Sequence, residues 1–596
     1  MPGPRRSSRR ANQRVMNRNP GLSKAGTRRI PPTWKSRPGR SGILLVAFAA
    51  LSLVLSGSRQ VVDDDFFAMR KNFEIFGSLY ETLVLSYVDP IDPERLMRRG
   101  VAAMLEELDP YTVFIDEADY LEANIQQGRR LGSVGLDIDY RDGRLTVISP
   151  IDGGRAFRQG IRVGDVIARV AGQDASRLSR GDVLQLLAGD PGSVVEVEIA
   201  RPGEAGPRVF SLTRAVVHAD PVAHSSFVLD DREAGVAYIR LATFNPGSDD
   251  RVREELQRLS DLSALKAVVL DLRDNQGGLL ESAVSVAQLF LPAGSTVVTI
   301  RGRHPEDLRE YRTTGAPRYP DLPVFVLINQ RSASASEIVA AALQDHDRGA
   351  VVGETSFGKG LAQVVFRLPF NTGIKVTTAR FYTPSGRSVQ SVDYRWQIEH
   401  DVDTREAADS LRGRFTTAAG RPVRGGGGVE PDVPIIRRPP GPLESALLQD
   451  GAYFRYADNI AANLVTRPES FEPADVDLDA FRLWLAERDF AFETRADQLI
   501  DDLSDELAVR PLVERATEAA AANALAALES IVDREKGLAF DRESDALRRG
   551  LFEAIVVRLA TNPAEQYEAQ LPHDRYIDEV LRLVSDRPAY EALLRP

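Results

Sequence analysis

The sequence predicts a multidomain α/β protein with helical regions at both ends. Residues 219–437 alternate apolar strand-like runs with helix-like segments, which is typical of a buried sheet covered by helices. Residues 128–215 contain short strands of alternating polarity, separated by Gly and Asp turns. Residues 62–126 and 440–596 place apolar side chains at helical spacing. A chain of 596 residues is long enough for three or four domains.

The N-terminus has the charge pattern of a membrane-targeted segment. The first 40 residues hold twelve of the 75 Lys and Arg residues and none of the 86 Asp and Glu residues. An Arg-rich tail alone is typical of nucleic-acid binding, but the uncharged run Ser41–Ser58 follows it. Basic residues before an apolar run indicate a tail that stays in the cytoplasm. We therefore expect a basic tail at 1–41, and at 42–58 a transmembrane signal anchor or, alternatively, a signal peptide cleaved near Gly57.

The basic tail also predicts where the rest of the chain lies. The acidic remainder after residue 58 is expected outside the cytoplasmic membrane, in the periplasm or beyond it. A start at Met16 would shorten the tail without changing this topology.

In residues 62–126 we expect two helices. The spacing of Phe66–Val84 predicts the first, and the second is expected at Pro93–Leu108, where Asp109 ends it because it precedes a proline.

The strand-rich region 128–215 resembles a PDZ domain. The resemblance is carried by Gly132–Leu136, which opens a strand, and by Gly160–Ile167. Further strands are expected at Leu136–Tyr140, Arg144–Ile148 and Val194–Ile199, with a helix at Arg180–Leu187. The alternative is a small β domain without a specialised role.

PDZ domains bind C-terminal peptides by strand addition and hold the carboxylate on backbone amides. The resemblance therefore implies a peptide-binding loop whose residues are Gly132, Ser133, Val134, Gly135 and Leu136. Ser133 stands where the family prefers a glycine. Leu184 or Leu187 is expected to line the pocket for the terminal side chain, although either position is also compatible with the domain core.

The α/β region 219–437 contains the expected elements of the largest domain. The strands are expected at Val236–Leu241, Ala267–Leu272, Thr296–Ile300, Val324–Ile328, Ala350–Gly353 and Ile374–Phe381. The helices are expected at Asp249–Ser260, Leu279–Leu289 and Ser334–Gln344. A polar, Gly-rich insertion occupies about 393–428.

The residues with the strongest chemical signal are a serine cluster and a lysine that follows it. The chain has no cysteine and six histidines, so thiol chemistry is excluded and histidine-based acid/base chemistry has few candidates. A serine activated by a lysine is the simplest alternative, and it points to amide hydrolysis. Ser334 at a helix N-terminus would gain from the helix dipole. Ser332 and Ser336 are rival nucleophiles, and Ser334 with Glu337 also fits a purely structural capping box.

Lys359 lies in the glycine-bracketed segment Gly353–Gly360. A solvated loop lysine is the structural alternative, but seven apolar neighbours favour a desolvated amine with a lowered pKa, as a general base requires. Gln363 is placed to orient that amine. A nucleotide-binding loop is disfavoured because Gly360 stands where Ser or Thr must bind magnesium. The Ser-x-x-Lys motif of penicillin-binding enzymes is disfavoured because Gly358 interrupts the required helical turn.

The segment Asp271–Gly278 is a third candidate element. An ordinary strand-to-helix turn explains its glycines structurally. Functionally, the amide of Gly277 or Gly278 is expected to join that of Ala335 in an oxyanion hole.

Residues 62–437 resemble the carboxyl-terminal processing peptidases, the tail-specific serine proteases of family S41 with a PDZ domain. Besides the PDZ region, the matching segments in chain order are Gly100–Tyr111, Asp271–Gly278, Ser332–Glu337, Thr355–Gln363 and Thr377–Arg387. The resemblance implies a crotonase-like (ClpP/crotonase) α/β core with Ser334 as nucleophile, Lys359 as general base and Gln363 as the residue that orients the lysine. It implies oxyanion donors at Ala335 and at one glycine of the 277–278 pair. The helical region 440–596 is not explained by it.

The leading interpretation is a serine endopeptidase that cleaves exported proteins near their C-termini, with substrate recruited or gated by the PDZ domain. We expect protein or peptide C-termini and the cytoplasmic membrane as partners, and no cofactor, metal or nucleic acid. A homo-oligomer or an activating adaptor stays open. The main rival is non-enzymatic, a PDZ adaptor on an inactive protease fold.

Overall fold

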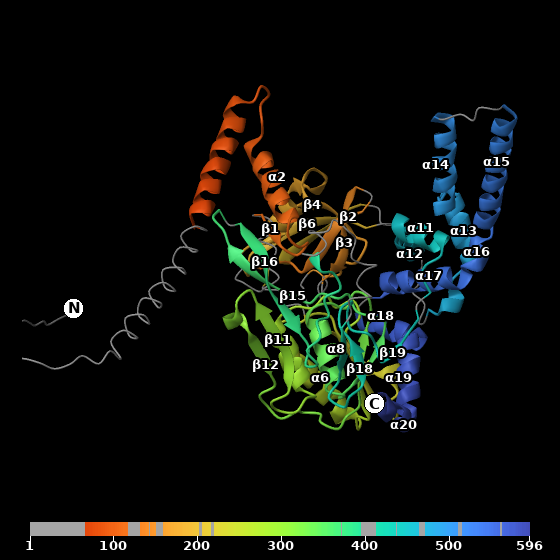
Figure 1. Ribbon diagram of the computed structural model, residues 1–596. Helices are drawn as coiled ribbons and strands as arrows, with labels where there is room; N and C mark the ends of the chain where they lie inside the picture. Colours follow the sequence, from red (N-terminus) through yellow and green to blue (C-terminus); the bar gives the residue numbers. More distant parts are fainter. Residues whose placement is uncertain are drawn as a thin grey trace, which may run out of the picture. The chain divides into compact units, whose positions relative to one another are not determined.

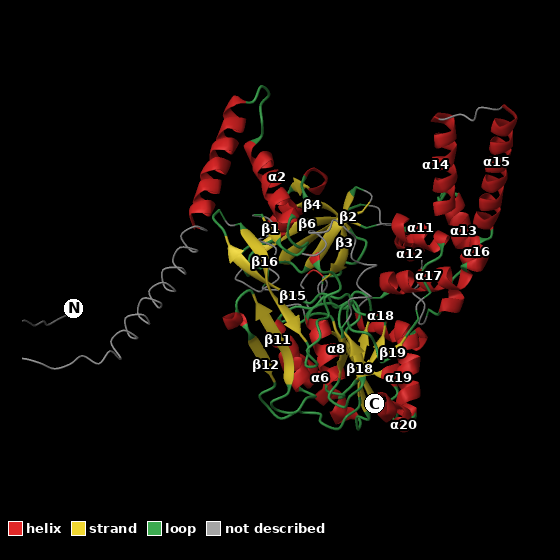
Figure 2. Ribbon diagram, in the orientation of Figure 1, coloured by secondary structure: helices red, strands yellow, loops and turns green. Residues whose placement is uncertain are grey.

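The chain divides into two units, Met1–Met97 and Arg98–Pro596. The computed structural model describes residues 66–116, 132–141, 143–150, 156, 159–201, 206–215, 220–370, 372–394, 413–436, 438–463, 471–509, 515–560 and 563–596 (Figures 1 and 2). The predicted basic tail and membrane segment lie outside these residues. Among the described residues, no helix is both long enough and apolar enough to cross a membrane.

The first unit contains a helix over residues 66–86 and the start of α2 (Pro93–Glu106). The hydroxyl of Tyr80 donates to the carbonyl of Pro93 at 2.8 Å and thus joins the two segments. The helices predicted in this region are therefore confirmed, and the second ends at Glu106, before Asp109-Pro110.

An antiparallel sheet forms the domain predicted from the alternating strands. Its strand order is β2-β3-β4-β6-β7, with β5 paired to β4. The strands are β2 (Leu136–Arg141), β3 (Arg144–Pro150), β4 (Val166–Val170), β5 (Gln173–Asp174), β6 (Val194–Ala200) and β7 (Arg208–Thr213). Helix α5 (Arg180–Leu187) begins with a capping box between Ser179 and Asp182. Alternate strand residues such as Ile138, Val147 and Val197 are fully buried and form the core of this domain.

A six-stranded sheet is the centre of the α/β domain. Its order is β19-β14-β13-β10-β9-β8, and all neighbours are parallel except β8 and β9. The strands are β8 (Val222–Phe227), β9 (Val236–Leu241), β10 (Ala267–Asp271), β13 (Val324–Ile328), β14 (Ala350–Gly353) and β19 (Val433–Pro434). Strands β9, β13 and β14 have the predicted bounds.

Both faces of this sheet are buried. Val268 and Leu270 of β10 pack in one cluster with helices α6 (Ser248–Leu262), α7 (Leu280–Gln288) and α8 (Ala335–Asp345). Val269, on the opposite face, packs with α19 (Arg575–Ser585) and α20 (Arg587–Leu593). Helices close to the C-terminus of the chain thus complete the α/β domain, as expected for a mostly parallel sheet.

A second sheet has the order β1-β16-β11-β12, with β15 also paired to β16. Its strands are β1 (Val113–Ile115), β11 (Thr296–Gly302), β12 (Arg309–Arg312), β15 (Leu361–Arg367) and β16 (Gly373–Tyr382). The short strand β1 joins this sheet by antiparallel pairing of Phe114 with Ile374. This pairing brings the turn before β1 to the domain that contains Ser334 and Lys359.

The remaining helices confirm the helical character predicted after residue 440. They are α11 (Pro442–Asp450), α12 (Ala452–Asn463), α13 (Leu478–Ala486), α14 (Arg495–Val509), α15 (Arg515–Gly537), α16 (Ala539–Arg542), α17 (Ser544–Leu559) and α18 (Pro563–Gln570). Helices α11, α12, α13 and α17 share a core that includes Phe481 and Phe552. Within the predicted insertion, β17 (Arg414–Thr416) and β18 (Pro422–Arg424) form a two-stranded sheet.

Candidate active site

Three loops at the carboxyl ends of neighbouring parallel strands carry the predicted glycine pair, nucleophile and general base. The loop after β10 contains the glycine pair, the loop after β13 contains Ser334, and the loop after β14 contains Lys359. In open α/β sheets, ligands bind outside the carboxyl ends of the strands. The topology therefore brings together segments separated by up to about eighty residues of sequence.

Ser334 is the residue that precedes helix α8. Its backbone has φ +57° and ψ −112°, which is a strained conformation for a residue with a side chain. Such strain costs of order 1–3 kcal/mol and clusters at functional sites. The backbone N–H of Ser334 donates to Oε2 of Glu337 at 2.8 Å, as in the predicted capping box.

The two rival serines have buried hydroxyls with structural partners. Ser332 Oγ donates to the carbonyl of Leu272 at 2.8 Å. Ser336 Oγ donates to the carbonyl of Asn275 at 2.8 Å. Both residues are fully buried, whereas Ser334 is partly exposed. Ser332 therefore holds the loop after β13, and Ser336 the start of α8, against the loop after β10.

Glu337 connects the serine loop to the lysine loop. It is fully buried, and its carboxylate accepts four hydrogen bonds. Oε2 accepts from the backbone N–H groups of Ser334 and Lys359, the latter at 2.9 Å. Oε1 accepts from Ser356 Oγ at 2.6 Å and from the Gly358 N–H at 2.7 Å. Burial raises the pKa of Glu337, while these hydrogen bonds favour its ionised form.

Lys359 is half-buried, and its Nζ lies 4.6 Å from the centre of the Tyr111 ring. Burial lowers the pKa of Lys359, the charge of Lys375 lowers it further, and Glu337 and Asp109 oppose the shift. The expected desolvation is present, but its predicted source needs correction. Of the seven apolar neighbours, four have exposed side chains: Phe357, Val364, Val365 and Phe366. The buried ones are Val351, Val352 and Leu361, and the face of the Tyr111 ring lies against the amine.

Gln363, on β15, is linked to the turn that follows α2. Its Nε2 donates to Thr377 Oγ1 at 3.2 Å, and Thr377 Oγ1 donates to Asp109 Oδ1 at 3.0 Å. The N–H of Thr377 also donates to Thr112 Oγ1 at 3.1 Å. Two hydrogen bonds in series thus link the predicted lysine-orienting residue to Asp109, and a third bond fixes Thr377 to the same turn.

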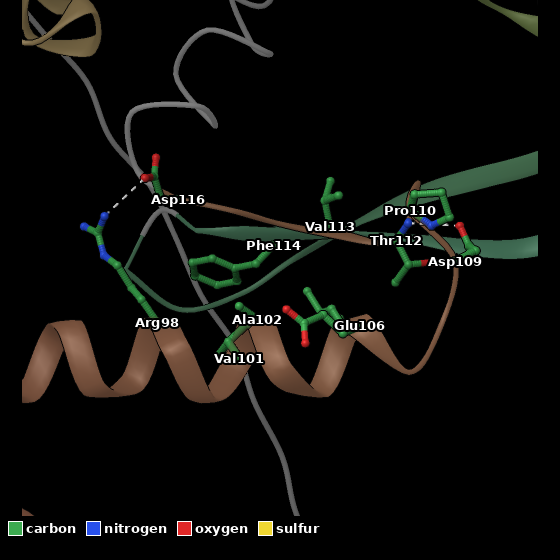
Figure 3. A pocket seen from close by; sticks show the side chains of 11 residues that line it. Arg98, Val101, Ala102, Glu106, Asp109, Pro110, Thr112, Val113, Phe114 and Asp116 are labelled. Carbon is green, nitrogen blue, oxygen red and sulfur yellow. Dashed lines mark hydrogen bonds and ion pairs between the residues drawn. The ribbon is translucent and has the colours of Figure 1, made fainter. Parts of the chain in front are cut away.

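This turn also borders a pocket of about 410 Å³ between α2 and β1 (Figure 3). Val101, Leu105 and Phe114 contribute apolar surface to the pocket. Figure 3 shows Asp109 at one end of it, beside Thr112. The pocket and the active-site turn therefore share residues.

The glycine pair after β10 lies against the start of α8. Gly277 has φ +103°, and a Cβ there would come within 2.9 Å of the Ala335 nitrogen, so only glycine permits this approach. The Gly277 N–H already donates to Asn275 Oδ1 at 2.9 Å. Of the predicted oxyanion donors, the amides of Gly278 and Ala335 therefore remain for a substrate oxygen.

Part of the predicted peptide-binding loop forms hydrogen bonds and core contacts within the β domain itself. The N–H groups of Gly132 and Ser133 donate to the carbonyls of Gly189 and Ala215, both at 2.7 Å. Val134 and Leu136 are buried in the domain core, and Gly135 between them has φ +76°. Among the two predicted pocket leucines, Leu187 is 2% exposed and belongs to that core, whereas Leu184 is partly exposed.

Sequence reasoning missed the contribution of Asp109, Tyr111 and Thr377 to the lysine environment. The sequence predicts a helix end at Asp109-Pro110, and nothing local indicates that Thr377, 268 residues away, contacts it. The single available signal was that both segments occur among the family-like motifs. Within the described residues, no group of three or more His, Asp or Glu side chains is arranged to bind a metal ion.

Comparison with known proteins places these residues in a family. Residues 235–404 match the model of peptidase family S41, and residues 443–584 match the model described as "Probable PDZ-protease, C-terminal helical domain". A carboxy-terminal-processing protease of Bartonella bacilliformis is 32% identical over 325 residues, covering 54% of this chain and 73% of the relative. A carboxyl-terminal-processing protease of Synechocystis is 35% identical over 298 residues, covering 49% of this chain and 68% of the relative.

A solved photosystem II D1 C-terminal processing protease aligns over 60% of this chain and 86% of its own, with 30% identity and a TM-score of 0.35. The extent and identity of the sequence matches confirm the family suggested by the motifs. The chain therefore belongs to the carboxy-terminal-processing proteases, serine peptidases of family S41.

Proposed function

We propose that this peptidase cleaves exported proteins near their C-termini, with Ser334 as nucleophile and Lys359 as general base. The observation that carries the proposal is the shared carboxylate of Glu337, whose Oε2 accepts from the backbone N–H of both residues. A crotonase-like core is proposed with it, in keeping with the S41 match over residues 235–404.

The choice of Ser334 among three serines rests on exposure and hydrogen bonding. A nucleophilic hydroxyl must reach a substrate carbonyl, and those of Ser332 and Ser336 are buried and donate to backbone carbonyls. Ser334 is partly exposed at the N-terminus of α8, where the helix dipole favours developing negative charge.

In the proposed reaction, the neutral amine of Lys359 removes the Ser334 hydroxyl proton as Oγ attacks the scissile carbonyl. The amides of Gly278 and Ala335 donate to the resulting oxyanion. The protonated lysine then gives its proton to the leaving amine, and water hydrolyses the acyl-enzyme. Because Gln363 Nε2 donates to Thr377, its Oε1 is the proposed acceptor for the lysine amine.

The β domain is proposed as a PDZ module that recruits or gates substrate C-termini. The name of the helical-domain model that matches residues 443–584 supports this assignment. Because the Gly132 and Ser133 amides are used within the domain, the carboxylate would meet the amides that follow, in Val134–Leu136. Leu184 is the proposed contact for the terminal side chain.

The experiment that tests the proposal compares Ser334→Ala with Ser332→Ala and Ser336→Ala. Purified full-length variants are treated with a fluorophosphonate that labels reactive serines, and peptide cleavage is measured in parallel. Ser334→Ala should abolish labelling and lower kcat by about a thousandfold or more. Labelling that persists in Ser334→Ala but is lost in a rival variant would reassign the nucleophile. Absence of labelling in the folded wild type would favour the non-enzymatic adaptor.

Lys359→Ala and Lys359→Arg should be as inactive as Ser334→Ala, since arginine stays protonated and cannot act as a base. Residues that act as a unit are not additive, so the double variant Ser334→Ala/Lys359→Ala should be scarcely worse than either single variant. C-terminal proteomics of cells with wild-type protein or Ser334→Ala would then identify the physiological substrates.

A further inference from the structure

Helix α19, near the C-terminus of the chain, begins beside two of the catalytic loops. Its N-cap residue Asp574 forms an ion pair with Arg273, with Oδ2 and Nη1 2.7 Å apart. Two residues later, the hydroxyl of Tyr576 donates to Glu354 Oε1 at 3.1 Å. Arg273 lies in the loop that carries the glycine pair, and Glu354 begins the loop that reaches Lys359. One helix start therefore contacts both loops.

Arg273 is held from both sides and is largely removed from water. Its Nε and Nη2 donate to the buried carboxylate of Asp271 at 3.0 and 2.6 Å, and its guanidinium lies 4.6 Å from the centre of the Tyr576 ring. Its side chain is 16% exposed, and that of Asp574 is 15% exposed. Asp271 is shared with Arg240 at 2.8 Å, and Arg240 also pairs with Asp274 at 3.2 Å. Asp574 is therefore a second carboxylate for Arg273, beside the shared Asp271. Loss of one partner of such a buried pair is strongly unfavourable for the charge left behind.

Gly353, directly before the lysine loop, leaves space for the ring of Tyr576. Gly353, the last residue of β14, has φ +135°, and a Cβ there would lie 2.7 Å from Tyr576 Cε1. Only glycine permits this conformation and this close approach. The Tyr576 ring thus packs on the end of β14 while its hydroxyl holds the next residue, Glu354.

Other residues, with apolar side chains, attach α19 to the sheet. Ile577, Val580 and Leu583 are fully or almost fully buried, in one cluster with residues of β9, β10, β13 and β14. Asp574 and Tyr576 direct their polar atoms to the loops instead. The attachment of the helix and the positioning of the loops are therefore separable by mutation.

The geometry points to Asp574 and Tyr576 as positioning residues for the peptidase reaction, Asp574 for the loop of the oxyanion donors and Tyr576 for the loop of Lys359. This inference rests on the proposed function for the roles of those loops. A displacement of about 1 Å in a catalytic group can lower the rate a hundredfold, so loosening either loop should lower kcat more than it changes KM.

The test uses two conservative variants of the full-length protein with two matched controls. Asp574→Asn keeps a good N-cap but removes the charge opposite Arg273. Tyr576→Phe removes only the hydroxyl that bonds Glu354. The controls are Asp586→Asn, which alters the N-cap of the neighbouring helix α20, and Tyr590→Phe, which removes a buried hydroxyl that bonds the backbone of Val324. Neither control residue contacts a catalytic loop through these groups.

Two readouts are measured for each variant: amide hydrogen exchange, and the kcat and KM for a fluorogenic peptide with a free C-terminus. Asp574→Asn should raise exchange in residues 271–278, and Tyr576→Phe should raise it in residues 353–359, with α19 still protected. Each should lower kcat by about tenfold while KM changes by less than about threefold. The controls should stay within about twofold of the wild type in kcat.

Unchanged exchange in both loops, or equal loss of activity in the controls, would overturn the inference. Increased exchange with wild-type kcat would show that the contacts hold the loops without serving the reaction, which also overturns it. Failure of the proposed function is seen separately, as activity retained by Ser334→Ala, and the exchange data still report on the contacts in that case.

Discussion

Ser334 and Lys359 are joined through a single atom, because the backbone N–H of each donates to Oε2 of Glu337, at 2.8 and 2.9 Å. The other carboxylate oxygen holds Ser356 and Gly358. A buried carboxylate is an acceptor only, so its two oxygens match four converging donors. A capping box alone would be satisfied by Glu or Gln at this position of the helix. The four donors explain why the residue is a glutamate.

Glu337→Gln should therefore damage both stability and activity. The amide NH2 group cannot accept, so up to two of the four donors lose their partner at roughly 1–3 kcal/mol each. We expect a clear fall in Tm and a loss of kcat/KM of at least about tenfold. Glu281→Gln is the matched control, since Glu281 lies exposed in the first turn of α7 and should change either quantity little. A Glu337→Gln enzyme with wild-type Tm and rate would show that the shared carboxylate is dispensable.

The ring of Tyr111 should influence the pH at which Lys359 becomes a base. Burial and the charge of Lys375 lower the pKa of Lys359, whereas an aromatic face near Nζ favours the ammonium. Glu337 and Asp109 also favour the ammonium. Because the neutral amine is the active form, kcat/KM should fall as the pH drops through the pKa of this lysine.

Tyr111→Leu removes the ring and should move that acid limb of kcat/KM to lower pH. Tyr111→Phe keeps the ring and should leave the limb where it is in the wild type. The measurement is a pH profile of kcat/KM for both variants on one peptide. A limb that stays in place, or moves to higher pH, in Tyr111→Leu would mean that the ring does not stabilise the charged lysine.

Cleavage should depend on the chemical nature of the substrate's C-terminus. Backbone amides that grip a carboxylate, and a pocket for a terminal apolar side chain, would discriminate against an amidated end or a terminal Asp. Peptides that differ only at this end should therefore be cleaved more slowly, while fluorophosphonate labelling of the serine stays unchanged. Deletion of about 130–215 should remove the difference, whatever the remaining rate. Equal cleavage of free-acid and amidated peptides by the intact enzyme would assign recognition of the end elsewhere.

The N-terminal charge pattern predicts a topology that fusions can test. A reporter fused after Gln60 should be exported, and one fused before Ser41 should stay in the cytoplasm. A soluble mature form that begins near Gly57 would favour a cleaved signal peptide over an anchor. Full-length protein in the soluble cytoplasm would contradict export altogether.

The sequence alone was sufficient for the central strands and for the family. Val324–Ile328 and Ala350–Gly353 match the structure because β-branched and apolar runs that are buried on both faces have few other solutions. Gly277 and Gly278 were recognisable as turn residues, and the Ser and Lys motifs lie on the loops where the pattern placed them. These are local signals, read within a few residues of chain.

Strands without such a signal were missed. The charged strand β12 and the strand β15 are strands because of their pairing: β12 pairs with β11 at the sheet edge, and β15 pairs with β16. Strand preference depends on cross-strand neighbours, which sequence windows do not contain.

Only the tertiary structure decided which residues surround the catalytic ones. Ser332 and Ser336 could not be separated from Ser334 until their hydroxyls were seen to bond the loop after β10. Tyr111 reaches Lys359, and Asp574 reaches Arg273, from hundreds of residues away. Periodicity and propensity describe how a segment folds, whereas such contacts depend on which sheet edges and helix ends the topology brings together, so they become visible only when the chain is folded.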